Sequence, residues 1–163
     1  ISYELSYRLP ENVREKLSDI LPVSTNYKGT ISGGITVDSR EIDSGVKCLV
    51  DVINMFEGIK TFSSCEGHSP DNKLYVLFHC ESIENIDKFS YYIDKYISEL
   101  WNKYDLGNKK FFVHLIYEYG KWKHMPGVFF EIRINYNDNI KDFTFKVVEE
   151  LSWLIKEALL NET

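Results

Sequence analysis

Leu74-Tyr75-Val76-Leu77-Phe78-His79-Cys80 is the stretch that decides the fold. Because side chains alternate across a strand, its residues form two sets, one for each face. The first set is apolar and consists of Leu74, Val76, Phe78 and Cys80, whereas the second consists of Tyr75, Leu77 and His79. This pattern predicts a buried strand with one face turned toward a hydrophobic core.

A long helical pattern follows this strand. Ser82 is placed to cap a helix over Ile83–Tyr104, and Gly107 is the predicted end. Apolar residues recur at helical spacing and predict one buried stripe, formed by Ile86, Phe89, Ile93, Leu100 and Tyr104.

The remaining elements extend the same alternation of helices and strand pairs. Asp38 and Glu41 have capping-box spacing before a helix that stops at Gly58. Strands are predicted over residues 60–65, 111–119 and 128–136, and a last helix over residues 141–160. The order predicts an α+β fold, with a mixed or antiparallel sheet and about three helices packed mainly on one face. The other face is expected to be open or to form the floor of a cleft.

Length and composition favour one soluble domain of 163 residues. Residues 1–37 are expected to form an N-terminal extension, and residues 38–163 an α-β-β-α-β-β-α core. No apolar run reaches the ~20 residues of a membrane helix, and no signal peptide is evident. The odd number of cysteines, three, favours reduced thiols and a cytoplasmic location. The net charge of −6 disfavours broad nucleic-acid binding.

Residues 63–68, Ser-Ser-Cys-Glu-Gly-His, place a thiol, a carboxylate and an imidazole within four residues. A zinc ion accepts Cys and His, so a metal site would use Cys65, His68 and His79. A thiol nucleophile with His68 or His79 as its base is a second possibility. A third is a tight turn in which the polar side chains only satisfy the backbone. His79 ends the following strand and is expected to face the same pocket as Cys65.

Two further regions carry polar or aromatic side chains. Arg133 shares a strand face with Glu131 and Asn135, beside the predicted face of His114 and Glu118. It is placed to bind a carboxylate or phosphate, or alternatively to form cross-strand ion pairs. The aromatic helix over residues 83–104 and a loop over residues 120–126 are expected surfaces for a protein partner or a homo-oligomer.

The segment over residues 43–81 resembles the Tyw3-like family of wybutosine-synthesising tRNA methyltransferases. The resemblance lies in residues 63–68 and in Val76-Leu77-Phe78-His79-Cys80-Glu81. It extends to small bacterial and phage proteins that carry Ser-Cys-Glu-Gly-His. The family resemblance implies an α+β domain that binds S-adenosylmethionine and modifies a tRNA nucleoside. The family's Arg at the end of the motif is His68 here.

The leading hypothesis is a pocket for a nucleotide, nucleoside or S-adenosylmethionine-like ligand at residues 63–68. Its predicted ligand-binding residues are Ser63, Ser64, Cys65, Gly67 and Arg133, and its predicted catalytic residues are Glu66, His68 and His79. One alternative is a noncatalytic interaction subunit of a larger bacterial or phage assembly. Another is a metal-dependent hydrolase.

Overall fold

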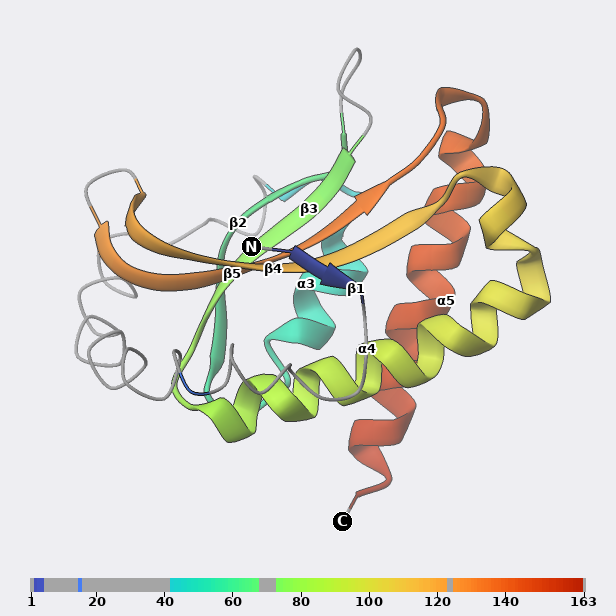
Figure 1. Cartoon of the computed structure of the whole chain (residues 1–163). Helices are drawn as coiled ribbons and strands as arrows, with labels where there is room; N and C mark the ends of the chain where they lie inside the picture. The colour runs from blue at the N-terminus through green and yellow to red at the C-terminus, as the bar shows by residue number, and fades with distance from the viewer. Residues whose placement is uncertain (1, 5–14, 16–41, 68–72, 123–124, 163) are drawn as a thin grey trace.

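The computed structural model describes residues 2–4, 15, 42–67, 73–122 and 125–162. Within these residues the chain has an α+β fold (Figure 1). From residue 47 onward, the elements follow the helix, strand, strand, helix, strand, strand, helix order predicted from the sequence.

The sheet has five strands in the order β1-β4-β5-β3-β2, and every neighbouring pair is antiparallel. β5 lies at the centre and pairs with β3 on one side and β4 on the other. The strands are β1 (Ser2–Glu4), β2 (Ile59–Cys65), β3 (Lys73–Cys80), β4 (Phe112–Trp122) and β5 (Met125–Asn135).

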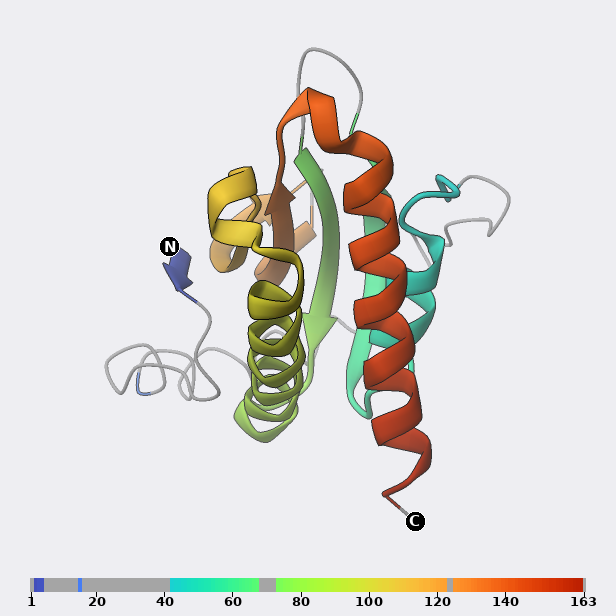
Figure 2. The ribbon, with the colours of Figure 1, turned by 90° about the vertical axis from the view of Figure 1, so that its right-hand side faces the viewer.

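The described helices all pack on one face of this sheet (Figures 1 and 2). α4 and α5 contact each other, and the short α3 lies beside α5. The α-helices are α3 (Lys47–Ile53), α4 (Ile83–Tyr104) and α5 (Lys141–Leu160), and the 3-10 turns are η2 (Leu106–Lys109) and η3 (Asp138–Ile140). The described helices include none long and apolar enough to cross a membrane.

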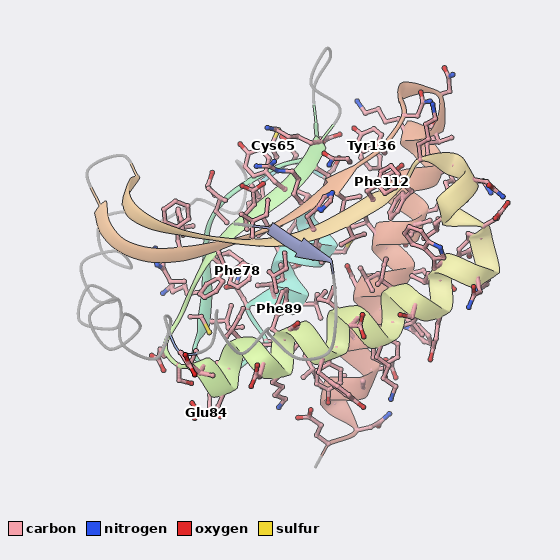
Figure 3. The ribbon with its side chains drawn as sticks, in the orientation of Figure 1. Cys65, Phe78, Glu84, Phe89, Phe112 and Tyr136 are labelled. Carbon is pink, nitrogen blue, oxygen red and sulfur yellow. The ribbon has the colours of Figure 1, made fainter. Side chains whose placement is uncertain are left out.

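The core forms where the apolar set of β3 meets α4. Phe78 is fully buried, and its ring centroid lies 4.9 Å from that of Phe89 and 5.7 Å from that of Phe130 (Figure 3). The alternate residues Ile132 and Ile134 of β5 are also fully buried on this face. The predicted alternation of β3 and β5 therefore selects the face that the helices cover.

The predicted range of α4, Ile83–Tyr104, is confirmed, but the residue that terminates the helix is Asp105 and not Gly107. Ser82 caps the helix, because its hydroxyl accepts a hydrogen bond from the Asn85 N–H at 3.2 Å. The helix stops at Tyr104, and Asp105 takes the left-handed conformation at φ 54° while donating its N–H to the Trp101 carbonyl. Asp105 therefore performs the C-terminal role that the sequence analysis assigned to glycine.

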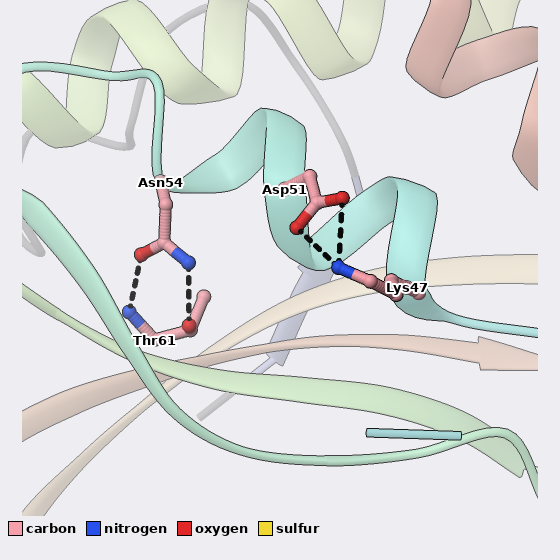
Figure 4. Close-up of polar contacts among 4 residues, drawn as sticks. All are labelled: Lys47, Asp51, Asn54 and Thr61. Atoms are coloured by element: carbon pink, nitrogen blue, oxygen red, sulfur yellow. Dashed lines mark hydrogen bonds and ion pairs between the residues drawn. The ribbon is translucent and has the colours of Figure 1, made fainter. Parts of the chain in front are cut away.

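α3 is shorter than predicted, and the predicted capping residues Asp38 and Glu41 lie outside the described residues. Its C-terminal end is attached to β2 by Asn54, whose amide accepts a hydrogen bond from the Thr61 N–H at 2.9 Å and donates one to Thr61 Oγ1 at 2.8 Å (Figure 4). An exposed ion pair of 3.2 Å joins Lys47 and Asp51 one turn apart.

The connection between β4 and β5 is tighter than the predicted loop over residues 120–126. The strands remain paired to the Trp122–Met125 position, through Gly120 opposite Gly127. Sequence reasoning ended these strands early because glycine and proline are uncommon in strand interiors.

Substitution of a core aromatic residue tests this packing. Phe89→Ala should lower the free energy of unfolding by about 3–5 kcal/mol, because a fully buried ring is lost and a cavity is left. The matched control Phe112→Ala removes a ring that is 45 % exposed and should lower it by less than about 1 kcal/mol. Urea unfolding measures both, and similar losses would contradict the assigned core.

Candidate functional site

Four polar side chains form a row across the sheet face that points away from the helices. Cys65 of β2 lies opposite Tyr75 of β3, Tyr75 lies opposite Arg133 of β5, and Arg133 lies opposite His114 of β4. Residues directly opposite each other in antiparallel strands share a face. With strands about 4.8 Å apart, this polar row extends about 14 Å from Cys65 to His114.

Tyr75 lies in the middle of the polar row and is partly buried. Burial raises the pKa of its phenol above the ordinary value, and the nearby Cys65, Glu131 and Asp43 raise it further, whereas a hydrogen bond with Ser63 lowers it. Tyr75 therefore remains protonated at neutral pH and is able to donate a hydrogen bond.

Arg133 is held by a carboxylate on its own strand. Its Nε donates to Glu131 Oε2 at 2.5 Å, and its Nη2 donates to Glu131 Oε1 at 3.2 Å. Glu131 is only 7 % exposed, so the guanidinium supplies the charge and the hydrogen bonds that a buried carboxylate needs. This two-point contact fixes the plane of the guanidinium, while the Arg133 side chain remains 30 % exposed.

The row ends at a hollow of about 300 Å³ between α4 and β4. Trp101 and Phe112 supply partly exposed aromatic surfaces to this hollow. Its polar lining consists of His114, Asp94 and Ser98. Aromatic surfaces combined with a few polar groups are typical of small-molecule sites.

The turn after β2 is held from two directions. The Glu66 N–H donates to Asp43 Oδ2 at 3.0 Å, and the Glu66 carbonyl accepts a hydrogen bond from the Tyr136 hydroxyl at 3.1 Å. Gly67 adopts φ 97°, and a Cβ there would lie 2.6 Å from the Tyr136 hydroxyl. Only glycine fits this position without strain. Figure 3 shows Cys65 and Tyr136 toward the same end of the sheet.

The structure does not place His79 beside Cys65. They share a sheet face, but Cys65 pairs with Tyr75, and His79 lies four residues farther along β3, about 13 Å away. The His79 ring instead stacks on Phe62 at 4.4 Å, within an apolar group of Phe62, Leu77 and Phe129. His79 is therefore too distant to act with Glu66 or to share a metal ion with Cys65.

Two other predicted site residues have different outcomes. Ser64 pairs with the buried Val76, so its side chain points to the helix side of the sheet, away from Ser63 and Cys65. His68 lies outside the described residues. The described part of the chain contains no group of three or more His, Cys, Asp or Glu residues arranged to hold a metal ion.

The aromatic surface of α4 is mostly committed to internal contacts. The hydroxyl of Tyr92 donates to Glu162, and that of Tyr104 donates to Glu150. Among the aromatic residues of α4, the exposed ones are Tyr91 and Trp101, whose exposed fractions are 42 % and 36 %. The loop expected to bind partners is largely strand, as described above.

Sequence reasoning missed Tyr75, Tyr136 and Asp43 as site residues. Tyr75 could have been found, because the alternation already placed it on the face away from the core. Tyr136 and Asp43 carried no such signal, because their contacts with Glu66 join positions 70 and 23 residues apart.

No protein-family model, curated protein or solved structure matches this chain. The resemblance to the Tyw3-like family stays a prediction.

The glycine of the turn provides a test of its geometry. Gly67→Ala should lower the free energy of unfolding by about 2 kcal/mol or more, through backbone strain and the clash with the Tyr136 hydroxyl. In a Tyr136→Phe background, which lacks this hydroxyl, Gly67→Ala should lower the free energy of unfolding by less than it does in the wild type. The control Gly107→Ala, whose Cβ would lie 3.3 Å from Trp101, should cost less than about 1 kcal/mol by urea unfolding. Equal losses at the two glycines would contradict the assigned turn.

The cysteines should differ in reactivity. Burial raises the pKa of Cys80 to about 12, and this thiol is 2 % exposed, so it should resist iodoacetamide until the protein unfolds. Cys65 is half-buried and should be alkylated in the native protein. Peptide mapping by mass spectrometry measures both rates, with urea-unfolded protein as the control. Equal native rates would contradict these environments.

Proposed function

We propose that this chain is a binding domain for a small ligand that contains a nucleoside, such as a nucleotide or S-adenosylmethionine. The observation that carries the proposal is the polar row from Cys65 to His114, which ends at the aromatic hollow beside Trp101 and Phe112. The row and the hollow meet at His114, which belongs to both.

The row and the hollow suit different parts of such a ligand. A nucleobase is flat and stacks on aromatic side chains, as the surfaces of Trp101 and Phe112 allow. Arg133 is oriented by Glu131 and suits a carboxylate or a phosphate. Near Tyr75, the carboxylate of Asp43 favours a hydroxyl or an ammonium group.

S-adenosylmethionine combines these groups in one molecule, since it has a base, ribose hydroxyls, an ammonium and a carboxylate. A nucleotide has the base, the hydroxyls and an anionic phosphate. Both ligand classes therefore carry the kinds of group that suit the side chains of the row and the hollow. The resemblance of residues 63–68 to the Tyw3-like family independently favours S-adenosylmethionine.

A thermal-shift screen with S-adenosylmethionine, nucleoside triphosphates and free nucleosides tests the proposal. A ligand at about 100 times its Kd stabilises the folded state by about 2.7 kcal/mol, which raises the melting temperature by several degrees. Tyr75→Phe and Trp101→Ala should each reduce this shift. The matched control Trp153→Ala changes an exposed indole on α5 and should leave it intact.

Arg133 requires a paired variant. Arg133→Gln alone would leave the buried Glu131 carboxylate without its bidentate partner, so Glu131→Gln is introduced with it. The double variant should fold. Relative to the wild type, it should lose more affinity for an anionic ligand than for a neutral nucleoside. No thermal shift with any of these ligands, or one unchanged in Tyr75→Phe and Trp101→Ala, would refute the proposed site.

A further inference from the structure

α5 carries a second surface that the proposed ligand site does not use. Its buried side faces the core, and its outer side presents residues spaced three or four apart. Two of them are large and apolar, since Trp153 is 58 % exposed and Leu160 is 53 % exposed. This outer stripe consists of Asp142, Lys146, Glu149, Trp153, Lys156 and Leu160.

A groove of about 770 Å³ runs beside this stripe, between α5 and α3. α3 supplies Cys48 and Val52 to it, and the turn after α3 supplies Met55. Met55 is 40 % exposed. Trp153 lies on the wall opposite α3, so the exposed indole and the apolar side chains of the opposite wall line the same groove, among charged residues. An exposed apolar surface of this kind marks an interaction site.

The charges around the groove divide into two groups. Asp51 is paired with Lys47, and Glu150 is paired with Lys103, so these two carboxylates are already neutralised within the chain. Lys146, Glu149 and Lys156 also line the groove, and they form no ion pair within the described part of the chain. Of these three, Glu149 and Lys156 are the two nearest to Trp153 along α5. They lie on either side of Trp153, about 10 Å apart along the helix axis.

We propose that this surface binds a second copy of the same chain, in a two-fold symmetric dimer with the two α5 helices antiparallel. With Trp153 close to the symmetry axis, Glu149 of each copy lies opposite Lys156 of the other. The indole of each copy enters the groove of the other, against Val52 and Met55. A two-fold interface uses the same patch on both copies, so it needs such self-complementarity.

The arrangement of charge favours this occupant over an unrelated helix. An acidic group and a basic group at similar distances on the two sides of an apolar centre are complementary to their own antiparallel image. A parallel arrangement would place Glu149 against Glu149 and Lys156 against Lys156, which is repulsive. Burial of the indoles supplies most of the affinity, because exposed ion pairs contribute little, and the two reciprocal ion pairs specify the orientation.

Sedimentation equilibrium of the full chain across a dilution series tests the dimer. The wild type should show a reversible monomer–dimer equilibrium. Trp153→Ala should raise the dimer dissociation constant by roughly 30-fold, as for the loss of a central aromatic anchor. The control Trp101→Ala removes an indole on α4 and should leave the constant unchanged. Thermal unfolding of the dilute monomers checks that each variant folds.

Charge reversal tests the predicted pairing directly. Glu149→Lys and Lys156→Glu should each weaken self-association by about tenfold, because each replaces two attractions with two repulsions. The double variant Glu149→Lys/Lys156→Glu should restore it. An equimolar mixture of the two single variants should form heterodimers, since all four charges are then complementary.

The possible results distinguish a second copy of this chain from a different protein in the groove. A chain that is monomeric at every concentration, or a dimer unaffected by Trp153→Ala, would overturn the proposal. A dimer that Trp153→Ala weakens, but in which neither the double variant nor the mixture restores association, would overturn the antiparallel pairing. Capture of a different protein by a monomeric chain through Trp153 would assign the groove to that protein and would also overturn the proposal.

Discussion

β5 pairs with β3 on one side and with β4 on the other, and the other parts of the structure depend on this double pairing. Because side chains alternate along each strand, a common register places the apolar residues of three strands on one face. Phe78, Phe130 and Leu115 are consequently buried together beneath the helices. A slip of one residue in β5 would move Phe130 off the core and would bring Glu131 into it.

The same register assembles the proposed site on the opposite face. Tyr75 and Arg133 become neighbours only because their flanking residues are held in the core. The buried Glu131 is stable there because the Arg133 guanidinium lies beside it. The turn that follows β2 is attached to β5 in a similar way, since Tyr136 reaches the Glu66 carbonyl from just beyond the end of that strand.

The proposed ligand site and the proposed dimer surface lie on different parts of the molecule. The ligand site occupies the sheet face and the β4 side of α4, whereas the dimer surface occupies α3 and the outer side of α5. Each proposal therefore has its own variants, centred on Trp101 and Trp153. The groove and the hollow share no lining residue, so ligand binding and self-association can be measured separately.

The sequence by itself determined the elements for which a local pattern was strong. The alternation in residues 74–80 identified β3 and its buried face, and Ser82 identified the start of α4, because these signals depend on neighbouring residues. It also placed Arg133 and His114 on adjacent polar rows. The sequence failed at Asp105, where a non-glycine residue takes the left-handed conformation, and at Gly120 and Gly127, which pair with each other within β4 and β5.

The tertiary structure alone decided which side chains meet. The sequence analysis joined Cys65 to His79, but the antiparallel register puts Tyr75 opposite Cys65 and carries His79 to the far end of β3. The same register places the side chain of Ser64 on the helix side of the sheet, away from Ser63 and Cys65. Local patterns specify the face of a strand, whereas pairing between strands specifies the position along it. Neighbouring residues do not encode that long-range register.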